Sequence, residues 1–483
     1  MTHMCDCYDA LLDEDLITPV HRHDNREELW VHLPDTGPRM MPLAQANQVV
    51  KALRPKVELT DVEHIEGGPR GIRRRHILRG VGAGLGALIA PSLGARYSFA
   101  ADVPGRTARE GEADLLVVVF LRGGMDALSL LPPDDAAYRA ARPVLAVPDA
   151  HVVALGSSGQ RLNTNASALL PLWNAGQLAL VLGCGIGPGT RSHFDEMARM
   201  ERAAAVGVRT GWIGRHLASS SAAEGTFRAI TWGGSAAVSL ATSFPTLAMS
   251  SIDTFNVTAT APAVREDVMR MVGEMYQDAG GVAAGTAGSV FEAIDGLADL
   301  RGATYIPANG AVYPNSPFGL NLRNTAELAK SGKGLEVACV DIGDWDMHQN
   351  VGLAANPGDW YSSQIRNLAE GLEAFRTDLG ELWQRTTVVT MTEFGRRVKE
   401  NGSRGLDHGR GMTMFVAGGA VVGGLYGSQP ADLAPENLTD GDLPITTDYR
   451  DVLAEIVRAR LANGANLETV FPGFTPTPVG VFG

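Results

Sequence analysis

Six largely apolar runs constrain the fold of this chain more than any other feature. They cover residues 114–121, 178–183, 227–232, 335–340, 386–391 and 414–417. A run without alternation of polar and apolar residues is typical of a strand buried on both faces of a sheet. Stretches with a helical pattern lie between the runs, for example 367–379 and 451–461. Strands alternating with helices predict an α/β fold, with a mostly parallel central sheet and helices on both faces.

Segment 71–100 has the pattern of an export signal. Residues 73–79 read Arg-Arg-Arg-His-Ile-Leu-Arg, and a short run rich in Gly and Ala follows. Paired arginines before a weakly apolar run indicate the twin-arginine route, and Ser98-Phe99-Ala100 fits a small-residue cleavage site. The alternative, an amphipathic helix with a basic start, would need an apolar stripe that is not visible here. We expect a protein exported folded to the periplasm or secreted, with the export machinery and signal peptidase as partners.

The rest of the chain is divided around this signal. We interpret residues 1–70 as a poorly ordered leader, which reflects either a start codon assigned too far upstream or a long n-region. Residues 101–113 are polar and predict a linker. The folded domain is expected over 114–476, with a cap or insertion near 236–330 where Ala, Gly, Ser and Thr abound. A tail covers 477–483.

Charge and cysteine content narrow the class of protein. The formal net charge of −13 argues against nucleic acid as a partner. No apolar run beyond the signal reaches the ~20 residues of a membrane span, so no stable span is expected after processing. Cys184 and Cys339 lie in strand-like runs, whereas Cys5 and Cys7 lie in the leader. The first two could pair in an oxidising compartment, but separate buried thiols are the simpler expectation.

Polar residues gather next to the predicted strands. The segments that follow strands are 122–126, 183–185 with 191–195, 341–348 and 392–397, and segment 407–411 precedes the last strand. In an open parallel sheet, sites form outside the carboxyl ends of the strands. Carboxylates together with imidazoles match divalent metals: zinc accepts nitrogen and oxygen ligands, whereas manganese, calcium and magnesium prefer more oxygen. The sequence therefore predicts one shared site that binds a divalent metal of unspecified identity.

Several of these residues also have a structural interpretation, which the sequence leaves open. Asp126 and Asp195 follow strands at positions where helix N-caps are common. Ser192 begins a stretch that resembles a capped helix start. Arg122 and Arg396 could each form a salt bridge to a carboxylate of the site.

The motifs at these positions resemble a family of exported bacterial proteins, the domain-of-unknown-function family 1501. The resemblance is carried by residues 121–128, 191–194, 211–215, 345–350, 392–397, 407–409, 447–450 and 470–473, in order across nearly all of 114–476. That family looks like a remote branch of the alkaline phosphatase superfamily, which includes sulfatases and cofactor-independent phosphoglycerate mutases. The resemblance implies an alkaline phosphatase-like, three-layer sandwich.

The same resemblance implies a set of site residues. The expected metal ligands are Asp126, His193, Asp346, His348, Glu393, Asp407 and His408. Asp344 is the second choice to Asp346, because the superfamily spaces this Asp and His four positions apart. Ser192 is the expected nucleophile and Ser129 its alternative. One departure stands out: the usual late Asp-His pair is Glu393-Phe394 here, so one imidazole ligand is missing.

The expected function is that of a metal-dependent hydrolase acting on small anionic substrates, namely phosphate or sulfate esters. A metal would activate the reacting groups, Ser192 or water would attack, and Arg122 and Arg396 would bind the equatorial oxygens. His408 would be a ligand or a general acid. The alternative is a non-catalytic exported binding or assembly protein on the same scaffold, which the missing imidazole favours. An α/β-hydrolase is a poor fit, because no Gly-x-Ser-x-Gly elbow follows these strands.

Overall fold

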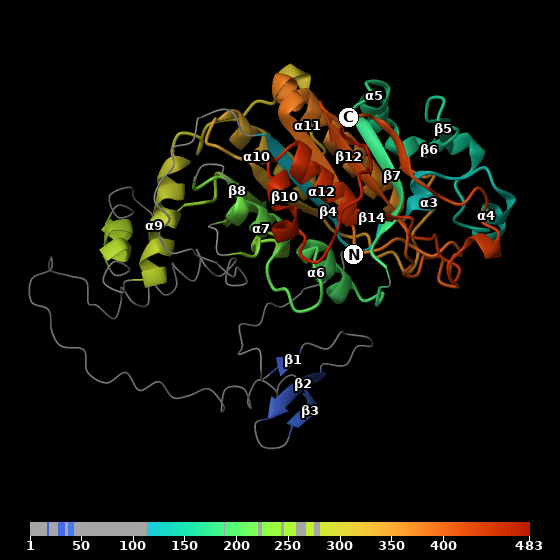
Figure 1. The fold of residues 1–483 in the computed structure, drawn as a ribbon, viewed down its shortest axis with the longest axis horizontal. Helices are drawn as coiled ribbons and strands as arrows, with labels where there is room; N and C mark the ends of the chain where they lie inside the picture. Colours follow the sequence, from blue (N-terminus) through green and yellow to red (C-terminus); the bar gives the residue numbers. More distant parts are fainter. Residues whose placement is uncertain are drawn as a thin grey trace, which may run out of the picture. The chain divides into compact units, whose positions relative to one another are not determined.

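The computed structural model describes residues 114–187, 189–220, 225–242, 246–256, 267–274 and 281–483, together with three short strands earlier in the chain (Figure 1). The chain separates into two compact units, 1–94 and 95–483. In the first unit β2 (Glu28–Leu33) pairs antiparallel with both β1 (Ile17–Thr18) and β3 (Gly37–Pro42). These strands fall within the predicted leader. The predicted signal and linker lie outside the described residues.

A mixed sheet forms the centre of the second unit. Its strand order is β13-β7-β12-β11-β4-β10-β8-β9, with β14 beside β7. Among the described strands of this sheet, β12 alone runs antiparallel to its neighbours. The bounds are β4 (Leu115–Leu121), β7 (Leu178–Gly185), β8 (Ala229–Trp232), β9 (Leu247–Met249), β10 (Val337–Ile342), β11 (Thr386–Met391), β12 (Met412–Gly418), β13 (Gly424–Gly427) and β14 (Thr447–Asp448).

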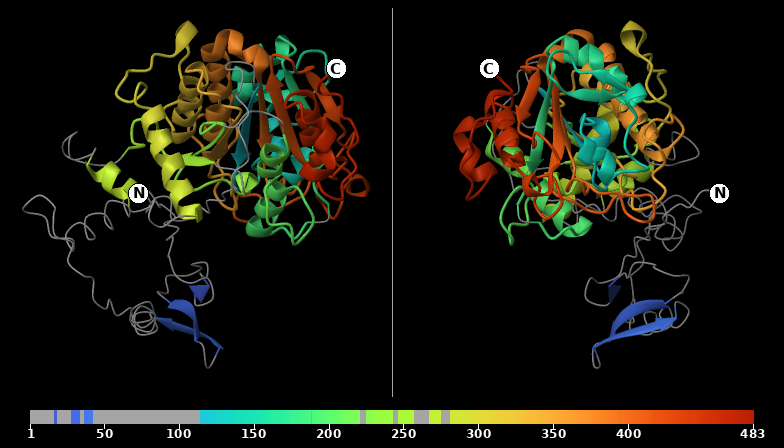
Figure 2. Two further views of the ribbon diagram at one scale, coloured as in Figure 1. Left: turned by 60° about the vertical axis from the view of Figure 1, so that its left-hand side comes forward. Right: turned by 90° about the vertical axis from the view of Figure 1, so that its right-hand side faces the viewer.

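Helices cover both faces of this sheet, which gives three layers (Figure 2). Successive side chains of the central strand β4 enter two different cores, because strand side chains alternate between faces. Val117 and Val119 pack in one core with α10 (Pro317–Lys330) and α11 (Trp360–Leu379). On the other face the core is formed with α6 (His193–Arg202), α7 (Trp212–Ser219), α12 (Tyr449–Ala459) and α13 (Leu467–Val470). The predicted α/β class is confirmed.

Shorter elements complete the second unit. They are α3 (Ala127–Leu130), α4 (Ala136–Ala141), β5 (Val152–Ala154), β6 (Arg161–Asn163), α5 (Leu170–Asn174) and α9 (Gly281–Gly296). The span 236–330, predicted as a cap or insertion, also contributes to the central layers. It supplies the edge strand β9 and the helix α10.

The last residues of the chain pack onto the domain. The carboxylate of Glu455 in α12 accepts hydrogen bonds from the backbone N–H groups of Val479, Gly480 and Phe482, each at 2.8 Å. Val481 is fully buried. The segment predicted as a tail is therefore fixed against α12.

Two other expectations concern the cysteines and membrane spans. Cys184 in β7 and Cys339 in β10 are separate, buried thiols. Burial raises the pKa of the Cys339 thiol to about 12, so it is fully protonated at neutral pH. In the described part of the chain, no helix is long and apolar enough to cross a membrane.

The direction of the strands brings distant segments to one edge of the sheet. The carboxyl ends of β4, β7, β10 and β11 meet there, because these strands are parallel. The connection from β11 to β12 contains no helix, so the chain returns antiparallel from the same edge. The segment before β12 therefore joins the segments that follow the parallel strands.

Candidate metal centre

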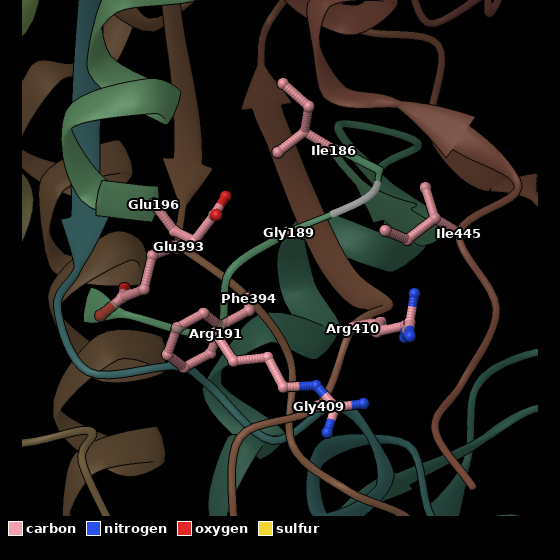
Figure 3. Close-up of a pocket in the computed structure, with 9 residues that line it drawn as sticks. All are labelled: Ile186, Gly189, Arg191, Glu196, Glu393, Phe394, Gly409, Arg410 and Ile445. Atoms are coloured by element: carbon pink, nitrogen blue, oxygen red, sulfur yellow. The ribbon is translucent and has the colours of Figure 1, made fainter. Parts of the chain in front are cut away.

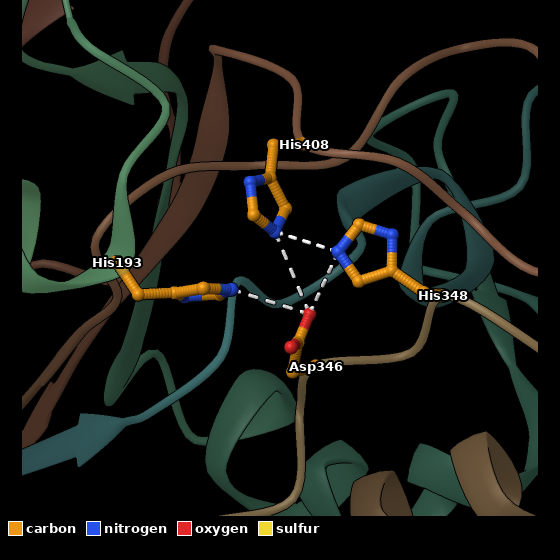
Figure 4. Close-up of side chains that lie close together, drawn as sticks. All are labelled: His193, Asp346, His348 and His408. Carbon is orange, nitrogen blue, oxygen red and sulfur yellow. Dashed lines mark hydrogen bonds and ion pairs between the residues drawn. The ribbon is translucent and has the colours of Figure 1, made fainter. Parts of the chain in front are cut away.

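Four side chains converge outside this edge (Figure 4). They are His193, Asp346, His348 and His408, and one ligand atom from each lies within 4.8 Å of all the others. His193 is the first residue of α6, which begins after β7. Asp346 and His348 lie in the loop after β10, and His408 precedes β12. All four belong to the ligands predicted from the sequence.

The distances between these atoms fit a single ion. Oδ1 of Asp346 lies 3.1 Å from Nε2 of His348, 3.2 Å from Nε2 of His193 and 3.5 Å from Nε2 of His408. The Nε2 atoms of His348 and His408 are 2.8 Å apart. Ligands held about 2.0–2.1 Å from one ion are about 2.8–3.4 Å apart for bond angles between 90° and 109°. These four spacings, 2.8–3.5 Å, cover nearly the same range.

The opposite edge of each imidazole ring is held by an oxygen. The partners are Glu393 Oε1 at 2.7 Å from His193 Nδ1, the Arg191 carbonyl at 2.7 Å from His408 Nδ1, and Asp407 Oδ1 at 3.2 Å from His348 Nδ1. A carbonyl oxygen only accepts, so Nδ1 of His408 carries its hydrogen. Such oxygen partners orient ligating histidines and direct the Nε2 lone pair toward a metal.

The three inward-facing nitrogens share one protein partner, Oδ1 of Asp346. Two Nε2 lone pairs at 2.8 Å, those of His348 and His408, repel each other unless a proton or a cation lies between them. The buried Nε2 of His193 lies 3.2 Å from Oδ1 of Asp346, the same oxygen that the other two imidazoles face. This donor set therefore fits a bound cation.

The electrostatic field of the site also favours positive charge. Although burial opposes it, the hydrogen bonds with Asp346 and Glu393 raise the pKa of His193 to about 9. The pKa of Asp346 is lowered. Burial alone would raise this pKa, but hydrogen bonds from His193, His408 and Arg396 hold it well below its usual range. The carboxylate of Asp346 therefore stays ionised and available as a ligand.

Glu393 and Asp407, both predicted as ligands, support the imidazoles instead. Oε1 of the buried Glu393 accepts from the Gly123 N–H at 2.8 Å and faces His193. Oδ1 of the exposed Asp407 accepts from Asn401 at 2.8 Å and faces His348. Neither belongs to the converging group, because each carboxylate is engaged on the outer edge of a ring.

Asp126 does not fit its predicted role as a ligand. It is buried and forms a two-pronged ion pair with Arg142, with distances of 2.5 and 2.9 Å. The same carboxylate caps α3 by accepting from the Ser129 N–H at 2.9 Å. Arg142 also donates to the carbonyls of Arg397 and Val398. Asp126 thus anchors the segment after β11 through Arg142.

The two arginines predicted to bind substrate oxygens are engaged within the protein. Arg122 pairs with Asp341 at 2.7 Å and Glu201 at 3.3 Å, and its guanidinium lies 4.4 Å from the centre of the Phe120 ring. Arg396 is buried and contacts five oxygens: four carbonyls, those of Gly123, Gly124, Trp345 and Leu406, and Oδ1 of Asp346. The salt-bridge interpretation therefore describes both residues.

The candidate nucleophiles differ in their surroundings. Ser192 occupies the N-cap position of α6, but its hydroxyl makes no capping hydrogen bond. Glu196, in the first turn of α6, accepts a hydrogen bond from the N–H of Thr190, which precedes the helix, at 2.7 Å. Ser129 is buried, and its hydroxyl accepts from Arg142 at 3.1 Å. Only Ser192 is next to a residue of the centre.

Asp344, the second choice to Asp346, and Asp195 both lie outside the centre. Asp344 is exposed in a left-handed conformation with φ of 64°, and its carbonyl accepts from Trp360 at 2.7 Å. Asp195 is exposed in the first turn of α6. The structure brings Asp346, and not Asp344, to the histidines.

Gly123 permits the close approach of two loops. Its φ of 121° lies in a region that residues with side chains rarely adopt, and a Cβ there would come 2.3 Å from the backbone nitrogen of Asp346. The loop after β4 therefore contacts the backbone of the loop that holds Asp346. This contact explains the first of the two glycines that follow the first predicted strand; at Gly124 a Cβ would come 2.8 Å from the Phe394 ring.

A small pocket is lined by residues next to the centre, among them Glu393 and Phe394 (Figure 3). Its cavity volume is about 20 Å³, which accommodates one or two water molecules. Arg191 and Arg410, which line it, both pair with the buried Asp442. Phe394 also lines it and packs against His193 and His408, with ring centres 4.9 and 4.4 Å apart. The pocket is too small for an ester substrate.

Sequence reasoning missed several residues of this site. The carbonyl of Arg191 was not predicted as a partner of His408, although the residue belongs to the motif that contains Ser192 and His193. Asn401 and Arg142 carry no local signal: Asn401 donates to the His348 carbonyl 53 positions away, and Arg142 donates to the Val398 carbonyl 256 positions away.

Comparisons with known proteins give limited information. A family model described as "Protein of unknown function (DUF1501)" matches residues 325–458, which include Asp346, His348 and His408. No curated protein matches the sequence. Among solved structures, the PsFucS1 sulfatase from Pseudoalteromonas sp. aligns with a TM-score of 0.29 and 10% identity, over 80% of this chain and 72% of that chain. Similarity at this level carries no functional argument.

Proposed function

We propose that this centre binds one divalent transition metal and that the protein hydrolyses phosphate or sulfate esters there. The observation that carries the proposal is the convergence of three imidazole nitrogens and one carboxylate oxygen at ligand spacing. Three nitrogen ligands favour zinc over manganese, calcium or magnesium, which prefer more oxygen ligands.

The accessibility of the centre supports a catalytic rather than a closed structural site. The side chains of Asp346 and His348 are 49% and 42% exposed, so solvent and substrate reach this side. A metal bound here would polarise the ester oxygen and supply hydroxide near neutral pH. Each imidazole ring is oriented by an oxygen on its outer edge, from Glu393, Asp407 or the Arg191 carbonyl. Arg396 orients Asp346. Water is the favoured nucleophile, with Ser192 as the alternative.

A metal-binding or assembly protein without turnover is the second candidate. The observation that favours it is the engagement of Arg122 and Arg396 by protein groups, which leaves both unsuited to bind a phosphoryl or sulfuryl group. The metal centre itself would then be the functional feature.

One experiment separates the two candidates. The purified protein is assayed for metal content by mass spectrometry and for turnover of aryl phosphate and aryl sulfate esters. We expect about one ion per chain and metal-dependent turnover, both lost in Asp346→Ala and His408→Ala and retained in Asp344→Ala, the matched control. Metal without turnover supports the second candidate. Turnover unchanged in His408→Ala contradicts the assignment of the site.

We also propose that this activity takes place outside the cytoplasm. The pattern around Arg74 and Arg75 supports the proposal. Replacing both arginines by lysine in a bacterial host with a twin-arginine system is expected to leave the protein in the cytoplasm. Unchanged export of that variant argues against this route.

A further inference from the structure

A larger pocket begins two residues beyond His348. It is lined by Val144, Leu145, Asn350, Gly352, Leu353, Asp359 and Arg404, and its cavity volume is about 260 Å³. Pockets that bind small molecules measure ~300–1,000 Å³, so this one suits a single ring with a substituent. It is more spacious than the pocket of about 20 Å³ beside Phe394.

The walls of this pocket are continuous with the metal centre. The Asn350 N–H donates to the Ser403 carbonyl and the Val351 N–H to the Arg404 carbonyl, both at 3.0 Å. These bonds join the loop that carries His348 to the segment that carries Asp407 and His408. The two loops therefore hold metal ligands at one end and the pocket at the other.

Backbone strain occurs on both walls. Asn350 has φ of 49° and Arg404 has φ of 56°, so both adopt the left-handed conformation. For residues other than glycine this conformation costs free energy, and it persists only where the surroundings fix it. In this case the paired loops fix it, and they set the position from which the Arg404 side chain extends.

The pocket holds one guanidinium, that of Arg404, and one carboxylate, that of Asp359. Among the described residues, no hydrogen bond or ion pair of the exposed Arg404 guanidinium is recorded. The nearby carboxylate of Asp359 is engaged by the Leu353 N–H at 2.7 Å and by Asn356 at 3.0 Å. Arg404 differs in this respect from Arg122 and Arg396, which were expected to bind the substrate.

Apolar surface accompanies this charge. Val144 and Leu353, which line the pocket, are 44% and 42% exposed. A ligand with an apolar body would cover them and remove them from water. A ligand with a carboxylate would pair with the planar guanidinium, which suits two parallel hydrogen bonds.

We propose that this pocket binds the leaving group of the ester, and that this group is a small ring bearing a carboxylate held by Arg404. The inference rests on the hydrolase function proposed above. In the reaction, water attacks phosphorus or sulfur, the bond from that atom to the leaving oxygen breaks, and this oxygen takes up a proton. The released alcohol or phenol then keeps its carboxylate on Arg404.

A binding measurement tests the pocket independently of turnover. The probe is 4-hydroxybenzoate, and 4-hydroxybenzamide is its neutral analogue. Calorimetry is expected to show that Arg404→Gln weakens binding of the acid at least about 10-fold, the loss of one charge-assisted pair. Binding of the amide should change little. Arg270→Gln, which removes an exposed arginine elsewhere, should behave as wild type.

Two results would overturn this assignment. One is equal affinity of wild type and Arg404→Gln for 4-hydroxybenzoate, including the absence of binding to either. The other is loss of binding in Asp346→Asn with retention in Arg404→Gln, which would place the carboxylate on the metal.

A kinetic assay with ester substrates is the second test of this pocket. We expect Arg404→Gln to lower kcat/KM for 4-carboxyphenyl phosphate or sulfate about 10-fold or more relative to the unsubstituted phenyl esters. Hydrolysis of neither ester, with Arg404-dependent binding of 4-hydroxybenzoate retained, would reject the hydrolase and support the binding site. Hydrolysis with an unchanged ratio would reject the pocket and support the hydrolase.

Discussion

Arg396 donates from Nη2 to Oδ1 of Asp346 at 2.9 Å, and this is the oxygen that faces the three imidazoles. The arginine is buried, whereas the aspartate is half exposed. A side chain fixed from inside the protein thus sets the position of a ligand at the surface. Loss of a contact of this kind, behind the ligands, typically lowers metal affinity about 10- to 100-fold.

The first prediction concerns this pair. Arg396→Lys keeps the charge but cannot reach the four carbonyls and Asp346 together, since a single ammonium replaces a planar fork. Metal affinity is expected to fall about 10- to 100-fold, as measured by competition with a chelator. Arg122→Lys, which changes an arginine paired with Asp341 and Glu201, is the control. Equal effects of both variants would show that the loss is not specific to Asp346.

The second prediction concerns Glu393. In Glu393→Gln the side chain can still accept from the Gly123 N–H, but it no longer places a negative charge beside His193. We expect metal affinity to fall about 10- to 100-fold with little change in thermal stability. Loss of all bound metal, as in Asp346→Ala, would indicate that Glu393 is a direct ligand.

The third prediction separates Asp126 from the metal. Removing one partner of a buried ion pair leaves the other charge unpaired, so Asp126→Ala is expected to lower the free energy of unfolding by about 3–5 kcal/mol. Urea denaturation measures this change. The folded fraction should retain its metal. A variant of normal stability that lacks metal would restore Asp126 as a ligand.

The fourth prediction concerns acid stability. Glu336 is buried and bonded to His216 and Arg228. Burial raises its pKa, but these hydrogen bonds outweigh burial and hold the pKa below its usual value of 4.5. A carboxyl whose folded pKa is depressed stabilises the protein above its unfolded pKa of about 4.3, and this stability is lost as pH falls through the folded pKa.

Unfolding in urea between pH 3 and pH 6 tests this prediction. The stability of wild type should decline below about pH 4.3. In Glu336→Gln the decline should be shallower, because one titrating group is gone. A decline of equal slope in both proteins would show that Glu336 does not contribute to it.

The sheet could be predicted from the sequence because each strand is a local signal. All six predicted runs correspond to strands, and helices 367–379 and 451–461 correspond to α11 and α12. The antiparallel direction of β12 was not predicted. It follows from the absence of a helix between β11 and β12, and the composition of that segment does not show this absence. The edge strand β9 is only three residues long, too short to form a recognisable run.

The candidate site was predicted in part for a related reason. His193, Asp346, His348 and His408 stand beside predicted strands, and the common edge brings them together. The roles of Asp126 and Arg396 could not be derived, because they depend on partners such as Arg142 and the carbonyl of Leu406, fixed only by the fold. Arg404 follows no strand, and its importance emerges only from the pocket that it lines.

The central claim is that three histidines and Asp346 hold one ion. The most direct measurement is the metal content of the folded protein after dialysis against zinc or manganese, for wild type, Asp346→Ala and Asp344→Ala. The account predicts about one ion per chain in wild type and in Asp344→Ala, and less than about one tenth of that in Asp346→Ala. Equal metal content in all three, or none in wild type, would contradict it.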